Sequence, residues 1–253
     1  MKMHLLSGGR LRMRKSTFVP AADRAATIEL PVFGALIRHA QGNVLFDTGC
    51  HPRAAEDAAG CWGGLARFMT PIMPPGDNVI AGLTALGLST DDIDVVVNSH
   101  LHTDHCGCNA FFPKATFVAH ALEIETARAA SGDMTGYFAS DWDTGAKLDA
   151  ITGERDLFGD GRIMLLHLPG HTPGSIAGLV ELDQSGSLLL AGDTVSLQET
   201  LATDVLPRNT WNAEALTRSL SEVRRIAKSG AVVIASHDAA QWDTLRQGAH
   251  AYD

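Results

Sequence analysis

A run of six residues at positions 100–105, with the sequence HLHTDH, holds four side chains that can bind a metal ion. In an extended chain alternate side chains point to the same side, so His100, His102 and Asp104 can converge on one point. His105 follows at the turn beyond and can reach a neighbouring point. Neutral imidazoles and carboxylates are good ligands for zinc and for other first-row divalent metals. The spacing therefore predicts a metal site.

Three further residues strengthen this prediction. His171 stands in the turn 168–174, LPGHTPG, where glycine and proline fix the backbone and leave the ring free to point into a cleft. Asp193 and His237 each end an apolar segment. A carboxylate such as that of Asp193 would be costly there without a partner. Each residue alone is weak evidence. Taken with the HLHTDH run, they indicate one polar site at which several strands end.

The elements that must position these residues can be predicted from apolar segments bounded by Gly, Pro and Asp. We expect strands at Thr27–Arg38, Asn43–Asp47, Val95–Ser99, Thr116–Ala119, Ile163–Leu168, Ser175–Glu181, Ser187–Ala191 and Ala231–Ser236. We expect helices at Val79–Leu86, His120–Ala130 and Ala213–Lys228, the last with the clearest apolar stripe. Because strands and helices mix along the whole length, the fold class is α/β with packed layers.

The two halves of the chain repeat one pattern. A strand that ends at Asp47 precedes a strand that ends in Ser-His at His100, and a strand that ends at Asp193 precedes one that ends in Ser-His at His237. We interpret the repeat as a structural duplication in which both halves present their strand ends to one edge. The alternative is chance similarity between short apolar segments.

Two long segments, Cys50–Asn78 and Gly132–Gly161, have no regular pattern and are expected to be irregular. The first is dense in Gly and Pro yet contains Trp62, Leu65 and Phe68. Such apolar residues predict a cap over an active site or a subunit interface at 50–78. A loop lying on the body of the protein is the alternative.

Composition restricts the binding partners. The net charge of -9 disfavours nucleic acid, because binding to a polyanion needs clustered Lys and Arg. The chain has no apolar stretch near the roughly 20 residues that cross a bilayer, and its start is too short in apolar residues for a signal peptide. The cysteines at positions 50, 61, 106 and 108 are then expected to be free thiols in a cytoplasmic protein.

The ordered set of HxHxDH, a later Gly-His, an aspartate and a final histidine resembles the metallo-β-lactamase superfamily. The resemblance covers about Leu45 to His237. It implies a single domain over residues 1–253 with an αββα sandwich of two similar halves. It also implies two divalent metal ions, with zinc as the expected metal. One ion would be held by His100, His102 and His171, the other by Asp104, His105 and His237, and Asp193 would bridge them. Both sites are then filled without Cys106 and Cys108.

Within the superfamily the chain is most similar to the N-acyl homoserine lactonase (quorum-quenching lactonase) group. The segments 92–102, DIDVVVNSHLH, and 236–242, SHDAAQW, carry this similarity. That group has a tyrosine three residues after the bridging aspartate, where it supports the substrate carbonyl. This chain has Ser196 there, which leaves a different lactone or an ester as alternative substrates. Asp47 is expected to orient a ligand imidazole from behind.

The function expected from this resemblance is hydrolysis of a small-molecule lactone by a hydroxide that bridges the two metals. Asp193 would hold the metals around the nucleophile, and Asp104 would pass a proton to the leaving alkoxide. A carboxylesterase or phosphotriester hydrolase of the same fold is an alternative. A metal-binding sensor without turnover is an alternative of another class. The group resembled is often dimeric, so a homodimer is expected.

Overall fold

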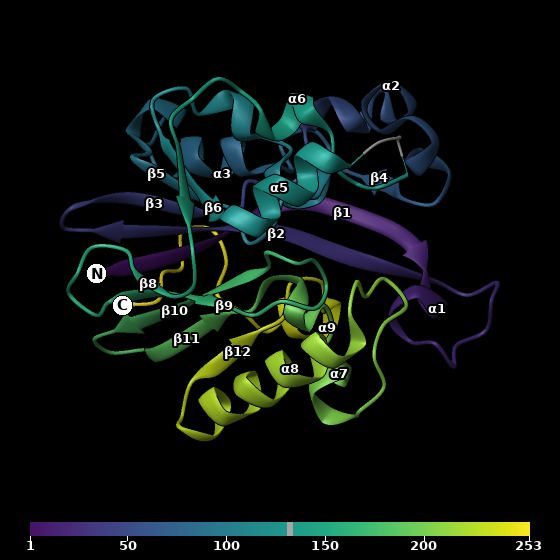
Figure 1. Ribbon diagram of the computed structural model, residues 1–253. Coiled ribbons are helices and arrows are strands. Elements are labelled where there is room, and N and C mark those ends of the chain that lie inside the picture. Colours follow the sequence, from purple (N-terminus) through teal and green to yellow (C-terminus); the bar gives the residue numbers. More distant parts are fainter. Residues whose placement is uncertain (131–133) are drawn as a thin grey trace.

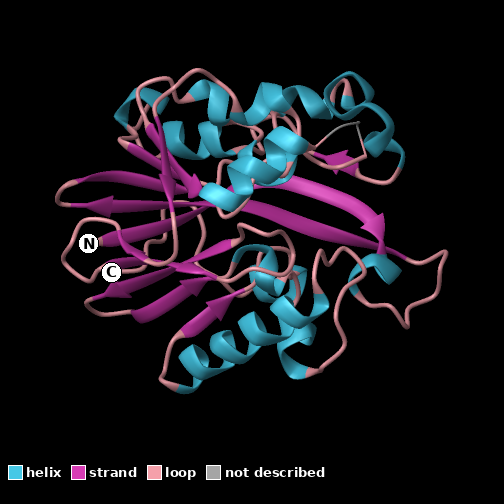
Figure 2. Cartoon of the chain, viewed as in Figure 1, coloured by secondary structure: helices cyan, strands magenta, loops and turns pink. Residues whose placement is uncertain are grey.

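The computed structural model describes residues 1–130 and 134–253. Two sheets lie face to face, and helices cover the outer face of each sheet (Figures 1 and 2). This arrangement confirms the predicted α/β class and the αββα layering.

The larger sheet comes from the first 151 residues, apart from the undescribed ones, and has the strand order β4-β1-β2-β3-β5-β6-β7. Strands β3, β5, β6 and β7 run parallel, while β1 pairs antiparallel with both β2 and β4. In chain order the strands are β1 (Lys2–Arg14), β2 (Thr27–His39), β3 (Gly42–Phe46), β4 (Thr70–Ile72), β5 (Val95–Val97), β6 (Thr116–His120) and β7 (Leu148–Ile151).

The smaller sheet follows in the chain and has the order β12-β11-β10-β9-β8. Its strands pair antiparallel except for β11 and β12, which are parallel. The strands are β8 (Arg155–Asp156), β9 (Ile163–His167), β10 (Ile176–Leu182), β11 (Gly186–Leu190) and β12 (Val232–Ile234).

The helices are mostly short and connect these strands. The α-helices are α1 (Lys15–Phe18), α2 (Ala58–Trp62), α3 (Val79–Ala85), α4 (Thr103–Cys106), α5 (Ala121–Ala129), α6 (Ala139–Trp142), α7 (Gln198–Ala202), α8 (Ala213–Lys228) and α9 (Ala239–Trp242). Single 3-10 turns are η1 (Pro52–Ala55), η2 (Gly63–Arg67), η3 (Thr90–Asp92), η4 (Asn109–Phe111) and η5 (Gly192–Val195). Within the described residues, no helix combines the length and apolar character that a membrane crossing requires.

The main core lies between the two sheets. Phe46 and Val97 from the larger sheet share one buried cluster with Leu165 and Leu190 from the smaller sheet. A second cluster lies outside the smaller sheet, where α8 buries the apolar stripe that its sequence predicts, with Leu216 among its members. Each sheet buries apolar area on both faces, which holds it firmly between its neighbouring layers. The strand ends are therefore fixed in position and can support the side chains that follow them.

The repeat seen in the sequence corresponds to a repeat in the topology. Strands β3 and β5 are parallel neighbours in one sheet, and β11 and β12 are parallel neighbours in the other. Helices occur in the connection in each case: α2 and α3, with β4 between them, precede β5, and α7 and α8 precede β12. Both pairs bring an aspartate and a Ser-His dipeptide to their carboxyl ends, as the duplication predicts.

The segments expected to be irregular contain more structure than predicted. Residues 52–72 hold η1, α2, η2 and β4, and residues 139–156 hold α6, β7 and β8. Gly132, the expected start of the second segment, lies outside the described residues. The predictions missed β4, β7 and β8 because strands of two to four residues at sheet edges are too short to show an alternating pattern. The first strand, β1, is also absent from the predicted list.

Two stacked histidines join the sheets close to the loops that follow β6 and β9. The rings of His120 and His167 lie 3.9 Å apart at 10°. Both ring nitrogens of His120 face backbone N–H groups, those of Leu122 and Gly153, so His120 also caps α5. Burial, together with the neighbouring imidazole, lowers the pKa of His120 to about 4.

We predict that His120 makes the fold sensitive to acid. The unfolded chain accepts this proton near pH 6.5, whereas the folded protein resists it down to about pH 4. The stability that the neutral ring contributes is therefore complete above about pH 6.5 and is lost as the pH falls toward 4. The variant His120→Asn keeps a capping side chain but cannot titrate.

Urea unfolding of both metal-free proteins between about pH 7 and about pH 4 tests this prediction. We expect His120→Asn to be less stable at neutral pH but to lose stability less steeply on acidification. Parallel pH profiles for the two proteins would show that His120 does not cause the sensitivity.

Candidate metal centre

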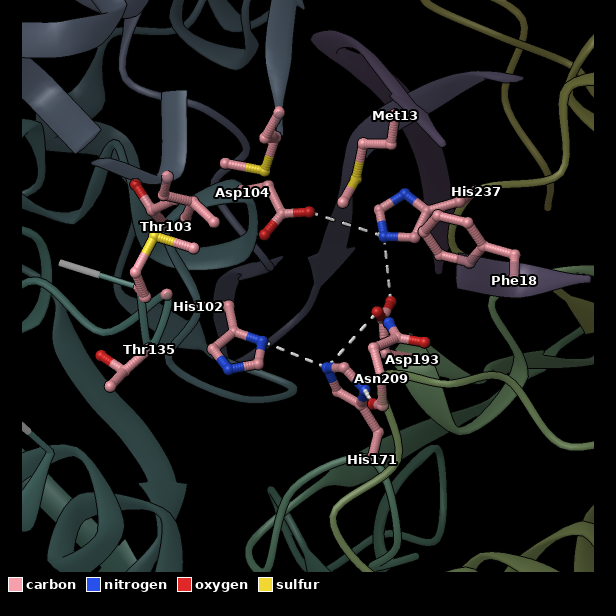
Figure 3. Close-up of a pocket in the computed structure, with 14 residues that line it drawn as sticks. Met13, Phe18, His102, Thr103, Asp104, Thr135, His171, Asp193, Asn209 and His237 are labelled. Atoms are coloured by element: carbon pink, nitrogen blue, oxygen red, sulfur yellow. Dashed lines mark hydrogen bonds and ion pairs between the residues drawn. The ribbon is translucent and has the colours of Figure 1, made fainter. Parts of the chain in front are cut away.

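All seven predicted ligands lie at or just beyond the carboxyl ends of strands, and their ligand atoms gather in overlapping groups. Figure 3 shows five of them, His102, Asp104, His171, Asp193 and His237, around one space. The HLHTDH run follows β5 and continues into α4. The turn after β9 carries His171, η5 after β11 carries Asp193, and the segment after β12 carries His237. The structure therefore brings together residues that are up to 137 positions apart in the sequence, from His100 to His237. The two sheets both contribute, so neither half holds the complete set.

Three imidazole nitrogens converge in the first ligand group. His100 Nε2 lies 3.0 Å from His102 Nδ1, which lies 3.1 Å from His171 Nε2. A tetrahedral zinc ion with Zn–N bonds of about 2.0–2.1 Å would place its ligand nitrogens about 3.3 Å apart. Burial, reinforced by the neighbouring imidazoles, lowers the pKa values of His100 and His102 well below the ordinary value. These rings are therefore neutral, with lone pairs available to a metal.

The second group consists of Asp104, His105 and His237. Asp104 Oδ2 lies 3.7 Å from His105 Nε2 and 3.6 Å from His237 Nε2. Within the described part of the chain, the buried Nε2 of His105 has no hydrogen-bond partner. This nitrogen faces the carboxylates of Asp104 and Asp193 without a hydrogen bond to either, an arrangement that fits a metal ligand and is otherwise costly.

Asp193 lies between the two groups. Its Oδ1 is 3.0 Å from His237 Nε2 and 3.3 Å from His105 Nε2, while its Oδ2 is 3.5 Å from His171 Nε2. Burial alone would raise the pKa of Asp193, but the surrounding imidazoles hold it well below its ordinary value. The carboxylate is therefore ionised and turns one oxygen toward each group.

The same charges act on the histidines of the second group. Burial opposes protonation of His105 and His237, yet the carboxylates of Asp104 and Asp193 raise both pKa values above the ordinary one. Asp47 contributes further to the raised pKa of His105. This half of the site thus has a strong negative field, which a cation would neutralise.

Asp47 lies behind the second group. Its Oδ2 accepts a hydrogen bond from His105 Nδ1 at 2.8 Å, which leaves Nε2 of that ring as the free nitrogen. Ser99 donates to Asp47 through both its backbone N–H and its hydroxyl, each at 2.7 Å. Among the described non-glycine residues, Asp47 alone has a positive φ, at 59°. A strained backbone at this point is maintained by the contacts that the carboxylate makes.

The other ring orientations are fixed by backbone carbonyls. His171 Nδ1 donates to the carbonyl of Asn209 at 2.8 Å, and His237 Nδ1 donates to that of Pro31 at 2.9 Å. The hydroxyl of Ser236 donates to Asp193 Oδ1 at 2.6 Å. In the neutral forms of His171 and His237, the Nε2 that faces the centre is therefore the nitrogen without a proton, as metal binding requires.

A cavity of about 180 Å³ opens onto this centre. In Figure 3, Met13 and Phe18 lie on one side, His102 and Thr103 lie opposite, and His171, Asp193 and Asn209 lie below. The apolar wall comes from three separate parts of the chain and consists of Met13, Phe18, Leu65, Met69 and Met134. Leu65 and Met69 belong to the segment 50–78.

Ser196 and the cysteines lie apart from the cavity surface. Ser196 is 2% exposed, and its hydroxyl has no hydrogen-bond partner among the described residues. Its carbonyl accepts a hydrogen bond from the backbone N–H of His237 at 3.0 Å. Cys106 and Cys108 donate to carbonyls of Leu101 and Cys50, and burial raises the pKa of both thiols. All four cysteines are unpaired.

Sequence reasoning missed several residues that support the ligands. Ser99 and Ser236 were visible as the repeated Ser-His dipeptide, but their role was not inferred. Glu123 is fully buried behind the ligand loops, and the sequence of its own helix gives no sign of the loops that it contacts. Asn209 supports His171 through its carbonyl, which no residue type would indicate.

Comparison with known proteins places these observations in a family. The model of the metallo-beta-lactamase superfamily matches residues 28–237. The N-acyl homoserine lactonase AttM of Azorhizobium caulinodans is 31% identical over 262 residues, covering 100% of this chain and 98% of the relative. AttM of Agrobacterium fabrum is 30% identical over 261 residues, covering 99% of this chain and 98% of the relative.

A solved structure is similar over almost the same length. An N-acyl homoserine lactone hydrolase with the product N-hexanoyl-L-homoserine bound at its catalytic metal centre has a TM-score of 0.89. The identity is 25%, over 99% of this chain and 98% of that chain.

We predict that removing the charge of Asp47 weakens metal binding without unfolding the protein. Asparagine tolerates the positive φ, but its neutral amide oxygen accepts the hydrogen bond from the His105 N–H more weakly than a charged carboxylate does. The variant Asp47→Asn should bind metal about 10- to 100-fold more weakly, as measured by competition with a chelator. Asp160→Asn is the matched control, because Asp160 makes the same contact with His39 at the surface, at 2.8 Å. Wild-type affinity in Asp47→Asn would contradict the prediction.

Proposed function

We propose, because the chain belongs to the metallo-beta-lactamase superfamily, that it is a metal-dependent hydrolase that opens lactone rings of the N-acyl homoserine lactone type. One observation carries the proposal: two ligand groups share Asp193 and open onto a cavity whose other wall is apolar. The named relatives are N-acyl homoserine lactonases, which supports the same substrate class.

The residues of the centre fit two divalent ions. His100, His102 and His171 would hold one, Asp104, His105 and His237 the other, with Asp193 between them. Nitrogen-rich ligands with two carboxylates suit zinc, which we propose as the metal. When bound, such ions supply Lewis acidity, which activates a water molecule and polarises the carbonyl of the substrate.

The carboxylates have different roles in this proposal. Asp193 is buried and fixed by Ser236, so it sets the spacing between the two ligand groups. Asp104 has 14% of its side chain exposed and lies on the cavity surface. We assign Asp104 the transfer of a proton from the attacking water to the alkoxide oxygen that is released when the ring C–O bond breaks.

The cavity favours a neutral, partly apolar substrate. Among the described residues that line it there is no lysine or arginine to pair with a carboxylate or phosphate. Its volume of about 180 Å³ is below the roughly 300–1,000 Å³ of typical ligand pockets. A lactone ring over the centre, with a short acyl chain against Met13, Phe18 and Met69, meets both constraints.

Ser196 favours carboxylester hydrolysis as a second candidate. The lactonase group has a tyrosine at this position, and here the buried Ser196 hydroxyl does not reach the cavity surface. Without a tyrosine hydroxyl to hold the substrate carbonyl, a lactone would gain no contact that a simple ester lacks.

The remaining expectations extend the proposal. We propose one catalytic domain, because each sheet supplies only some of the ligands. Leu65 and Met69 support the role of segment 50–78 as a cap. Four unpaired thiols are typical of a reducing cytoplasm. The homodimer stays a prediction, for which light scattering is the test.

A substrate panel tests the proposed function. It compares N-hexanoyl homoserine lactone, an unsubstituted γ-lactone, an aryl butyrate and a cephalosporin, each with and without a chelator. We expect turnover of the acyl homoserine lactone that a chelator abolishes and added zinc restores. The cephalosporin should not react, because no lysine or arginine among the described lining residues can pair with its carboxylate.

Two outcomes would contradict the proposal. Turnover of the aryl ester alone would replace the lactonase with the carboxylesterase. Absence of turnover on every compound by a protein with both metals bound would favour a sensor.

A further inference from the structure

Glu123 is a fully buried carboxylate that none of the proposed metal ligands uses. It lies on α5 and is 0% exposed. Burial of a carboxylate is costly unless hydrogen bonds compensate its lost hydration. Glu123 accepts three hydrogen bonds, from two backbone N–H groups and one tyrosine hydroxyl, and the positions of these donors indicate its structural role.

Two of these bonds reach the two loops that carry the first ligand group. Glu123 Oε1 accepts the N–H of Leu101 at 3.0 Å, and Leu101 stands between His100 and His102. Glu123 Oε2 accepts the N–H of Gly174 at 3.1 Å, three residues after His171. One carboxylate thus ties a loop of the larger sheet to a loop of the smaller sheet.

The contact with Gly174 is steric as well as polar. A Cβ at position 174 would lie 2.3 Å from the backbone nitrogen of Glu123 and 2.4 Å from its Cβ. No other residue could approach α5 so closely. The turn that carries His171 is therefore pressed onto α5 at a fixed distance.

The third bond extends to His102. The Tyr137 hydroxyl donates to Glu123 Oε1 at 2.9 Å, and the Tyr137 ring lies 4.6 Å from the ring of His102 at 57°. Burial and the Glu123 carboxylate raise the pKa of Tyr137, so its hydroxyl keeps the proton that it donates. Gly136 packs on the same imidazole, and its carbonyl accepts the N–H of Thr103 at 3.0 Å.

We propose that Glu123 is a positioning residue that sets the geometry of the three-histidine group, by fixing the His100–His102 loop, the His171 turn and the Tyr137 wall together. The inference rests on the proposal that these histidines hold a metal, and it does not depend on the substrate. The hydrogen bonds of Glu123 in the described structure go to Leu101, Tyr137 and Gly174, and none goes to a residue of the second ligand group. Its effect should therefore be selective for one metal of the two.

The variant Glu123→Gln tests this selectivity. Its amide has the same shape, but its NH₂ group would face one of the backbone N–H donors, so at least one bond is lost. Zinc titration of the metal-free protein, followed by NMR of ¹⁵N-labelled histidine, reports on each ring separately and needs no substrate. We expect the affinity of the three-histidine group to fall about 10-fold or more and that of the second group to stay within about twofold.

Two other variants complete the design. Tyr137→Phe keeps the aromatic wall and removes only the hydroxyl, so it should weaken the same group by a smaller factor. It also serves as the test if Glu123→Gln does not fold. Glu181→Gln is the control, because Glu181 on β10 accepts a hydrogen bond from Ser187 at 2.7 Å and lies away from the ligand loops.

The outcomes separate this inference from the proposed function. Equal weakening of both groups, or unchanged affinity of the three-histidine group, would overturn the positioning role while the lactonase proposal stands. Failure of the wild-type protein to bind zinc at either group would overturn the proposed function itself.

Discussion

The Asp193 carboxylate is the contact on which the rest of the site depends. It is 6% exposed and lies within 3.5 Å of imidazole nitrogens from three different loops. A buried charge in this position is stable only where cations or protonated rings surround it. The two sheets must therefore bring their strand ends to one edge, since the imidazoles that neutralise Asp193 come from both. The Ser236 hydroxyl then fixes which oxygen faces which group.

The two halves contain the same aspartate–serine hydrogen bond, but it has a different role in each half. In each half a strand-end aspartate accepts a hydrogen bond from the serine that precedes a ligand histidine, Asp47 from Ser99 and Asp193 from Ser236. Asp193 faces the centre, whereas Asp47, with its positive φ, lies behind it and orients His105. In the proposed centre, the same local pattern thus supplies a candidate metal ligand in one half and the support of a candidate ligand in the other. This difference explains why the duplicated fold contains an asymmetric site.

What could be predicted from the sequence was local. The HLHTDH run follows a strongly apolar strand, and α8 carries a clear helical stripe, so both could be read from neighbouring residues. Glu123 could not, because its importance comes from Leu101 and Gly174, which lie far away in the chain. The edge strands β7 and β8 were missed for a similar reason: pairing with β6 and β9, not a pattern of their own, makes them strands.

Electron paramagnetic resonance of the manganese-substituted protein tests most directly whether the Asp193 carboxylate joins two metal ions. We predict two ions per chain with an exchange-coupled spectrum, because ions that share Asp193 must be close and bridged. A single ion per chain, or two ions with the spectrum of isolated manganese, would contradict the shared site.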